Sequence, residues 1–390
     1  MTASLLTKIE EVVRSGNCSG CGACLLLDSG LRLELDENGF ARPVQREPSA
    51  AVPNADATFA ASCPGRVVRA QRPLGSERHP TMGPVVASWR AWAGDPELRR
   101  AGSSGGALTA LAAWLSETGR AARVIGTAPA TDARRTIPIA ITSRDQALAS
   151  AGSRYAPVTG AMPAAGGATI GTPCRISALR AMGPPHDEIL LSFLCAGTPS
   201  QLATDQLAAE LGVTGSADQL RYRGNGWPGR FEVQGADGSG SMSYEQSWGE
   251  RLGRQVHPRC KICPDGVGES ADITAADLWE ADDRGYPTFA DADGVSALAA
   301  RTVRGYELVL AAAAAGVLVI HPLRVEHLAA VQPLHEERRQ TLAGRLVGAL
   351  LAGRRVPRYR GFRLVRLALP RWRHSVRAAR GTFRRIRQAT

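Results

Sequence analysis

The stretch Asn17-Cys18-Ser19-Gly20-Cys21-Gly22-Ala23-Cys24 places a cysteine at every third position. Small residues fill the intervals, so the backbone can fold around one compact object and point amide groups at it. A fourth cysteine, Cys63, is followed directly by Pro64. Three serial cysteines with a remote Cys-Pro are typical of the thiolate ligands of a [4Fe–4S] cluster. The sequence therefore predicts such a cluster on Cys18, Cys21, Cys24 and Cys63.

The alternatives to a cluster are a structural zinc site and a redox disulfide. Zinc motifs usually pair two C-x-x-C units around a hairpin, whereas here three cysteines run in series. The spacing favours the cluster over both alternatives. We accordingly expect residues 1–75 to form a ferredoxin-like [4Fe–4S] segment.

Composition places the chain among globular proteins of a reducing compartment. Its 390 residues allow two or three domains, and 44% hydrophobic content supplies sizeable cores. Lys8, Glu10 and Arg14 interrupt any N-terminal apolar run, so we expect no signal peptide. No apolar stretch is long enough to span a membrane. Eight cysteines without an export signal then indicate metal ligands or catalytic thiols in the cytoplasm.

The positive charge is concentrated at one end of the chain. The whole chain carries +11, and residues 351–390 contribute thirteen arginines and no acid, so residues 1–350 sum to −2. This distribution disfavours nucleic-acid binding by the body of the protein.

Hydrophobic patterns predict a parallel sheet in the middle of the chain. Strands at 168–171 and 188–194 flank a helix at 176–181, which makes one βαβ unit. Residues 65–84 are rich in Gly and Pro and are typical of a linker. Further strands are expected at 31–35, 88–93, 124–127, 220–223, 230–234 and 317–320, and further helices at 1–16, 107–118, 306–315 and 335–351.

The four remaining cysteines define a second candidate metal site. Cys174 and Cys195 follow two neighbouring parallel strands, and ligands gather at the carboxyl ends of such strands. Cys260 and Cys263 form a C-x-x-C that can deliver two more thiolates. The alternatives are buried structural cysteines and a redox pair, and spacing alone does not decide among them.

Two glycine-rich stretches are candidate phosphate cradles. Residues 224–229 match G-x-G-x-x-G, but Pro228 and the following strand pattern indicate a hairpin-like turn instead of a dinucleotide fingerprint. In 102–106, Ser103 or Ser104 can cap the following helix while the glycines admit a ligand to the backbone. An ordinary helix cap is the alternative. Arg154 and Tyr155 offer phosphate pairing and ring stacking.

Several motifs, in this order along residues 15–330, resemble the beta subunit family of coenzyme F420-reducing hydrogenases and dehydrogenases, which is similar to plant 7-hydroxymethyl chlorophyll a reductase. Besides the cysteine motifs at 17–24 and 62–64, they are SSGG at 103–106, SRYAPV at 153–158, GTPCRISALR at 171–180, LSFLCAG at 191–197, RGNGWPG at 223–229 and CKICPDGVGESADI at 260–273.

The resemblance implies one non-covalent FAD and a second [4Fe–4S] cluster held by Cys174, Cys195, Cys260 and Cys263. The flavin-site candidates that it implies are Ser103, Ser104, Gly105, Gly106, Arg154, Tyr155, Thr172 and Arg175. One departure is the sequence at 276–277, where Ala276 stands in place of the family's usual glycine before Asp277. Its extra methyl group can narrow the flavin or substrate pocket.

The expected fold is α/β: the ferredoxin-like iron–sulfur segment, an α/β flavin-binding body with a mixed or parallel sheet, and a basic helical C-terminal tail. Residues 80–162 and 165–350 correspond to the N-terminal and C-terminal domains of the family, and 351–390 to the tail. The implied activity is electron transfer between coenzyme F420, or another small organic substrate, and ferredoxin or a redox partner subunit. The alternatives are a ferredoxin-dependent flavin reductase of another substrate and a non-catalytic electron-transfer subunit.

The tail has the pattern of a basic amphipathic helix. Its apolar residues recur at three- and four-residue steps, and they are Trp372, Val376, Ala379, Phe383 and Ile386. This pattern suits peripheral contact with the inner face of a membrane or an acidic partner. A solvated extension is the alternative.

Overall fold

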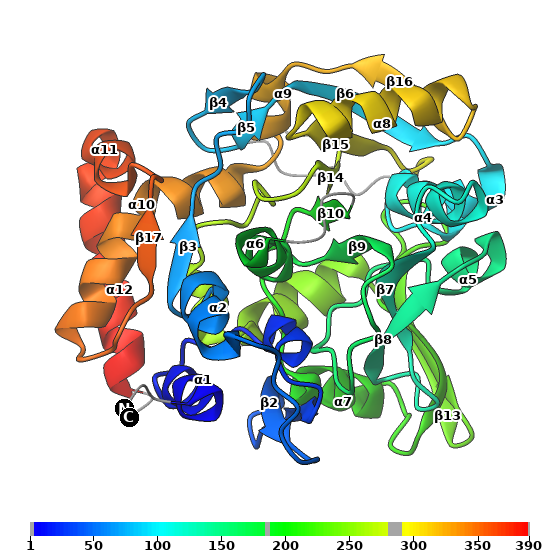
Figure 1. Ribbon diagram of the computed structural model, residues 1–390. Helices are drawn as coiled ribbons and strands as arrows, with labels where there is room; N and C mark the ends of the chain where they lie inside the picture. Colours follow the sequence, from blue (N-terminus) through cyan, green and yellow to red (C-terminus); the bar gives the residue numbers. More distant parts are fainter. Residues whose placement is uncertain (1–3, 184–187, 280–290, 389–390) are drawn as a thin grey trace.

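The computed structural model describes residues 4–183, 188–279 and 291–388. Its body is organised by an eight-stranded sheet in the order β16-β6-β15-β14-β10-β9-β7-β8 (Figure 1). The strands are β6 (Ala87–Ala93), β7 (Arg123–Pro129), β8 (Thr136–Ile141), β9 (Gly167–Gly171), β10 (Ile189–Phe193), β14 (Ile273–Asp277), β15 (Ser296–Ala300) and β16 (Leu318–Pro322). The patterns predicted β6, β7, β9, β10 and β16 and missed the other three.

The centre of the sheet is parallel and both margins are antiparallel. β7, β9, β10 and β14 run parallel, while β8 on one side and β15, β6 and β16 on the other pair antiparallel. The predicted βαβ unit is confirmed, with α6 (Pro173–Met182) between β9 and β10. The α/β class with a mixed sheet is therefore confirmed.

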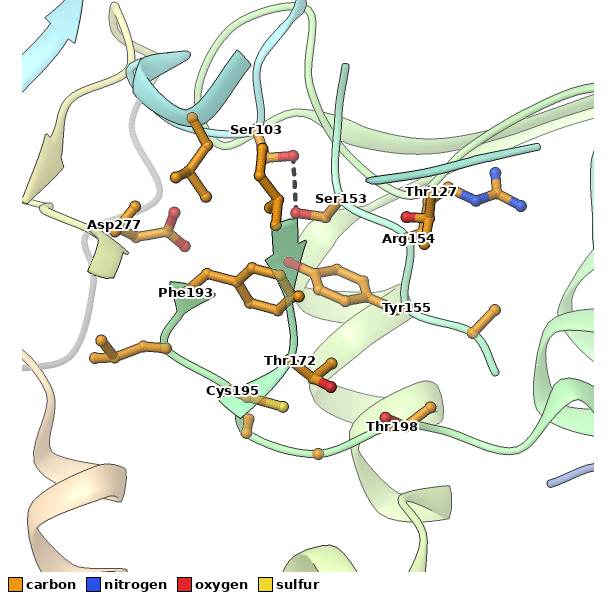
Figure 2. Close-up of a pocket in the computed structure, with 18 of the residues that line it drawn as sticks. Ser103, Thr127, Ser153, Arg154, Tyr155, Thr172, Phe193, Cys195, Thr198 and Asp277 are labelled. Carbon is orange, nitrogen blue, oxygen red and sulfur yellow. Dashed lines mark hydrogen bonds between the residues drawn. The ribbon is translucent and has the colours of Figure 1, made fainter. Parts of the chain in front are cut away.

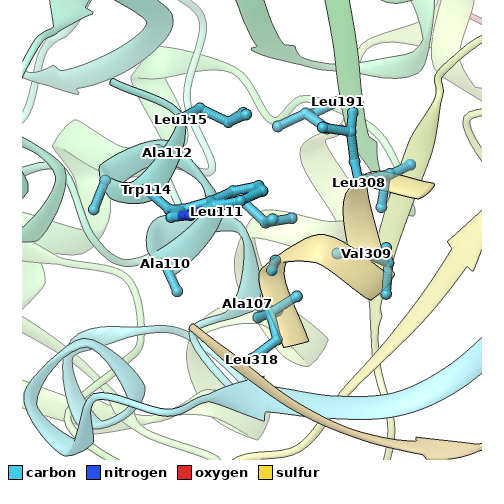
Figure 3. Packing of buried hydrophobic residues seen from close by; sticks show 14 of the residues in the cluster. Ala107, Ala110, Leu111, Ala112, Trp114, Leu115, Leu191, Leu308, Val309 and Leu318 are labelled. Atoms are coloured by element: carbon cyan, nitrogen blue, oxygen red, sulfur yellow. The ribbon is translucent and has the colours of Figure 1, made fainter. Parts of the chain in front are cut away.

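Helices cover both faces of this sheet. α4 (Ala107–Glu117) and α8 (Val303–Ala314) pack on one face, where Leu111, Leu191 and Val309 share a buried cluster (Figure 3). On the other face Leu190 packs with residues of α6. Neighbouring residues of β10 thus reach opposite layers, as strand geometry requires, and the hydrophobic burial of both layers fixes the strand register.

The N-terminal segment builds its own small core around the first cysteines. Its elements are α1 (Leu5–Arg14), the 3₁₀ turn η1 (Ala23–Leu26), β1 (Leu31–Leu35), β2 (Ala41–Gln45), α2 (Ala55–Ser62) and β3 (Val67–Arg69). Ile9, Leu33 and Phe59 are buried there, with Cys18, Cys24 and Cys63 packed against the same cluster. The predicted helix and first strand of this segment are confirmed.

Residues 65–84 are not the structureless linker that their Gly and Pro content predicted. They contain β3 and a hairpin of β4 (Glu77–His79) and β5 (Gly83–Val85). The linker prediction was wrong because β3 pairs with β17 (Arg358–Arg360), a partner from the far end of the chain.

The C-terminal elements form a layer beside the N-terminal segment (Figure 1, orange and red). They are α10 (Pro333–Leu351), β17, α11 (Leu364–Ala368), the 3₁₀ turn η5 (Leu369–Arg371) and α12 (Trp372–Gln388), whereas α9 (Val325–Ala330) packs on the main sheet through Leu328. α12 packs along α10. None of the helices in the described ranges combines the length and apolar character needed to cross a bilayer.

The remaining elements lie outside the eight-stranded sheet. They are α3 (Pro96–Ala101), α5 (Arg144–Ala149), α7 (Gln201–Glu210), β11 (Ala217–Arg221), β12 (Arg230–Gly235), β13 (Gly238–Ser243), a π-helical turn η2 (Glu245–Arg251) and the 3₁₀ turns η3 (Leu252–Gln255) and η4 (Pro258–Ile262). β11 and β12 are antiparallel, so the G-x-G-x-x-G stretch joins two strands and opens no helix. The rejection of a dinucleotide fingerprint there is confirmed.

Candidate functional site

A cavity of about 1000 Å³ opens at the carboxyl ends of the parallel strands. Thr172 follows β9, Phe193 ends β10 with Cys195 two residues beyond it, and Asp277 ends β14; all four line the cavity (Figure 2). Ligands collect at this edge of α/β sheets because the loops after the parallel strands meet there. The volume lies at the upper end of the range for small-molecule and cofactor pockets.

The structure brings the first four cysteines together. They line a small cavity of about 30 Å³ enclosed by Ile9, Phe59 and Met182. Burial raises the pKa of the Cys24 thiol, and the neighbouring Cys21, Cys18 and Cys63 add to that rise because like charges repel. The same two causes raise the pKa of Cys63.

The structure also brings together the four cysteines of the second set, which are Cys174, Cys195, Cys260 and Cys263. Burial raises the pKa of Cys195, and Cys260, Cys174 and Cys263 raise it further. Burial also raises the pKa of Cys174 to about 12 and that of Cys260 to about 11. A Cβ on Gly197 would lie 3.0 Å from the Cβ of Cys260, so the loop after β10 passes directly over the C-x-x-C turn.

Side chains from α10 and β17 hold the loops of the second set. Arg338 donates to the carbonyl oxygens of Cys195 at 2.8 Å and Ala196 at 2.9 Å. The Tyr359 hydroxyl donates to the Ile262 carbonyl at 2.7 Å, and Arg345 donates to that of Lys261 at 3.1 Å. These bonds fix the backbone that carries the thiols, as supporting bonds do around metal ligands.

Two buried arginines lie between the two sets. Arg175 donates to the Cys21 carbonyl at 3.4 Å and to the Met162 sulfur at 3.1 Å, and it follows Cys174 in sequence. Arg259 donates to the Pro64 carbonyl at 2.8 Å beside Cys63, and its charge also acts on Cys260 and Cys174. Cys21 itself raises the pKa of Cys174. The two sets are therefore neighbours.

The donor chemistry of both sets suits iron–sulfur clusters. All eight cysteines are free thiols. No three His, Cys, Asp or Glu side chains within the described ranges converge on one metal ion. A [4Fe–4S] cluster requires a different arrangement of ligands. Its four thiolates stand around the cluster, and each binds a separate iron atom. Buried thiols that repel one another when ionised are groups that bound iron cations stabilise as thiolates.

The serine–glycine loop before α4 is partly committed to the fold. Gly106, with φ of 70°, is the residue that caps α4, and neither Ser103 nor Ser104 does. Ser104 instead donates to the Val295 carbonyl at 2.6 Å, and the Gly105 amide donates to Ser296. The predicted serine cap is wrong because these hydroxyls face β15 and Ser153. Ser103, Ser104 and Gly106 line the cavity.

Arg154 and Tyr155 diverge in the structure. Arg154 donates to the carbonyl oxygens of Ala133, Arg135 and Leu220, and its guanidinium points away from the other labelled groups (Figure 2). Tyr155 faces the cavity beside Trp248, with ring centroids 4.6 Å apart. Thr172 also lines the cavity and lies 3.2 Å from the Cys174 sulfur.

A buried arginine at the cavity was not among the predicted site residues. Arg223 pairs with Asp277 at 2.6 Å, and its guanidinium lies 4.8 Å from the ring centroid of Trp227 and 4.7 Å from that of Tyr244. Burial is the largest single influence and lowers its pKa, but the Asp277 carboxylate together with Tyr155 and Tyr244 raises the pKa overall. Its Nε has no hydrogen-bond partner among the described residues. The signal available in the sequence was the position of Arg223 directly before the G-x-G-x-x-G turn, as the first residue of the RGNGWPG motif.

The acids Asp272 and Asp277 have different surroundings. Asp272 is buried, and Arg304 and Arg180 hold it at 2.6 and 3.1 Å. Asp272 therefore stabilises the fold, and only Asp277 reaches the cavity.

Comparison with known families adds to this geometry. The matching family models describe the two parts of the "Coenzyme F420 hydrogenase/dehydrogenase, beta subunit": residues 88–163 match its N-terminal part, and residues 167–326 match its C-terminal part. The chain belongs to this family. The resemblance seen in the motifs is thereby confirmed, and the chain takes its place among F420-linked redox subunits, which are oxidoreductases.

Among solved structures, the chain is similar to one in "Xenon derivatization of the F420-reducing [NiFe] hydrogenase complex from Methanosarcina barkeri". The two are 20% identical, with a TM-score of 0.48, over 68% of this chain and 96% of that one. No curated protein matches the chain.

Proposed function

We propose that this family member is an iron–sulfur flavoprotein that passes electrons between coenzyme F420 and ferredoxin or a redox partner subunit. One observation carries the proposal: a single large cavity touches both cysteine sets. Cys21 of the first set and Cys174 and Cys195 of the second all line it. An organic redox group in this cavity would lie against two groups of iron ligands.

The proposed cofactors are FAD in the cavity and two [4Fe–4S] clusters on the cysteine sets. A bound flavin takes two electrons as hydride and releases them singly to clusters that carry one electron each. Tyr155 and Trp248 offer ring contacts, and the Arg223 guanidinium offers a fixed positive charge with one N–H free of a described partner. Ser103, Ser104, Gly106 and Thr172 are the other proposed contacts.

The remaining predicted flavin residues receive different roles in this proposal. Gly105 and Arg154 support the loops of the cavity through the internal bonds described above. Arg175 supports the contact between the two cysteine sets. Closeness of Cys21 to Cys174 supports electron passage between the clusters, because it makes the two ligand sets adjacent.

The test is reduction of anaerobically purified protein by reduced F420. We expect flavin and cluster absorbance to bleach together, and ferredoxin to accept the electrons. In Cys260→Ser the flavin should still bleach, while electron delivery to ferredoxin falls at least about tenfold. Lys261→Met, in the same turn but with all thiols kept, is the matched control. If protein that contains flavin and clusters is not reduced by reduced F420, the proposal that F420 is the substrate is contradicted. If only reduced ferredoxin reduces that protein, another organic substrate is favoured.

Flavin extraction separates the proposal from a non-catalytic electron-transfer subunit. The proposal predicts about one FAD released per chain on denaturation. Clusters without flavin would leave only the electron-transfer role, and a colourless zinc protein would exclude both.

A further inference from the structure

The arginine-rich C-terminus is part of the folded molecule and not a loose extension. β17 pairs with β3, and Phe362 after it is buried with the Arg339 guanidinium 4.9 Å from its ring centroid. The Tyr359 hydroxyl is bonded to the C-x-x-C turn. The polypeptide that leads into α11 and α12 is therefore anchored at several points.

α12 packs against α10 through small residues of both helices. A Cβ on Gly344 would lie 2.1 Å from the Ser375 carbonyl oxygen, and one on Gly348 would lie 2.2 Å from that of Ala379. The two backbones touch where glycine leaves room, and Ser375 and Thr382 are the buried residues of α12. Trp372, Val376 and Phe383 of α12 stay exposed beside this contact.

Those large side chains face outward. The residues of this exposed stripe recur at steps of three, four and seven from α11 into α12, and their exposed fractions are Val365 70%, Leu369 66%, Trp372 59%, Val376 42% and Phe383 37%. An amphipathic helix ordinarily turns such a stripe towards the core. Here the core-facing side is already occupied by small residues, so the exposed stripe stays available to a second surface.

The formal charge of the segment that carries the exposed stripe is of one sign. Residues 351–390 hold thirteen arginines and no acid. Arg373, Arg380 and Arg384 are exposed on the same helix as Trp372 and Phe383. A surface that binds the exposed stripe must therefore offer both an apolar interior for its large side chains and negative charge for its arginines.

We propose that the exposed stripe docks on an anionic phospholipid surface. Trp372 and Phe383 would enter the boundary between headgroups and acyl chains, while the arginines pair with lipid phosphates. A lipid surface meets both requirements along the whole stripe because it needs no shaped groove. This inference does not depend on the redox function proposed above.

The experiment is flotation of the full-length, cluster-loaded protein with lipid vesicles. We expect binding to vesicles of phosphatidylcholine with phosphatidylglycerol, at least about tenfold tighter than to phosphatidylcholine alone, and weakened by salt. The double variant Trp372→Glu/Phe383→Glu should bind at least about tenfold more weakly. The matched control is Leu74→Glu, at an apolar residue that is 92% exposed outside the layer, which should bind like the wild type.

A second variant separates the charge from the apolar stripe. Arg373→Glu/Arg380→Glu keeps Trp372 and Phe383 and should lose preference for anionic vesicles by at least about tenfold. Equal binding to neutral and anionic vesicles, or unchanged binding by both double variants, would overturn the proposal. So would capture by immobilised polyglutamate or RNA without any vesicle binding.

Discussion

The close contact between α10 and α12 makes a sharp prediction about two glycines. In an ordinary exposed helix, replacement of glycine by alanine stabilises the helix by up to about 1 kcal/mol. Gly344→Ala and Gly348→Ala should do the opposite here. Each new methyl group meets a backbone carbonyl oxygen at 2.1 or 2.2 Å, and a backbone atom cannot rotate away.

The magnitude follows from the distance that α12 must move. Carbon contacts are favourable near 3.5 Å, so each variant demands a shift of roughly 1 Å or more along the helix pair. Overpacking of this kind costs roughly 1–3 kcal/mol, against a propensity gain of at most about 1 kcal/mol. The net expected loss is about 1–2 kcal/mol. The double variant should cost less than the sum, because one shift relieves both contacts.

Hydrogen exchange of the peptides that cover α12 measures this loss directly. The protection factors of these peptides should fall by roughly tenfold for each 1.4 kcal/mol lost from the free energy of opening. Gly381→Ala is the matched control: it lies on α12, and its Cβ would meet only the tip of the flexible Arg385 side chain at 3.3 Å. That variant should raise protection. If Gly344→Ala raised protection as Gly381→Ala does, the packing of the two helices would be refuted.

Three further predictions concern charges. Arg175→Met should lower the midpoint potential of the clusters by on the order of 60 mV, because a buried cation beside both ligand sets is removed; redox titration followed by EPR tests this, and exposed Arg120→Met should cause no shift. Asp277→Asn should reduce stability by about 2 kcal/mol in denaturant titration, since it leaves a buried guanidinium unpaired, whereas Asp293→Asn, at an 86% exposed side chain, should change little. Burial and neighbouring arginines lower the pKa of His257 to about 3, so as the pH falls below 6.5 the unfolded state takes up this proton before the folded state does, and the free energy of unfolding should decrease. His257→Gln should remove roughly 2 kcal/mol of the decrease measured between pH 6.5 and 5.

The cysteine spacing was enough to group the thiols, for a physical reason. Cysteines at i, i+3 and i+6 in a glycine-rich turn can face one centre, and Cys18, Cys21 and Cys24 line one small cavity. Cys174 and Cys195 follow adjacent parallel strands, which end at a common edge. The cavity at that edge follows from the same βαβ pattern, which hydrophobic periodicity revealed.

Other features depend on contacts that no local pattern encodes. β14 and β15 were missed because alanines in Ala275–Ala276 and Ala297–Ala300 carry little strand propensity, and their burial comes from the layers on both sides. Arg223 looks like an ordinary turn residue until Asp277 is brought to it by the sheet. The outward direction of the tail's stripe likewise depends on Gly344 and Gly348, far upstream in sequence.

Metal and sulfide content tests the central claim most directly, measured on anaerobically purified protein together with its EPR spectrum. We expect roughly eight iron atoms and a matching amount of acid-labile sulfide per chain. Cys18→Ser and Cys260→Ser should each lose about half, and each should remove a different reduced-cluster signal. Iron that stays unchanged in Cys260→Ser, or zinc in place of iron in either set, would contradict the account.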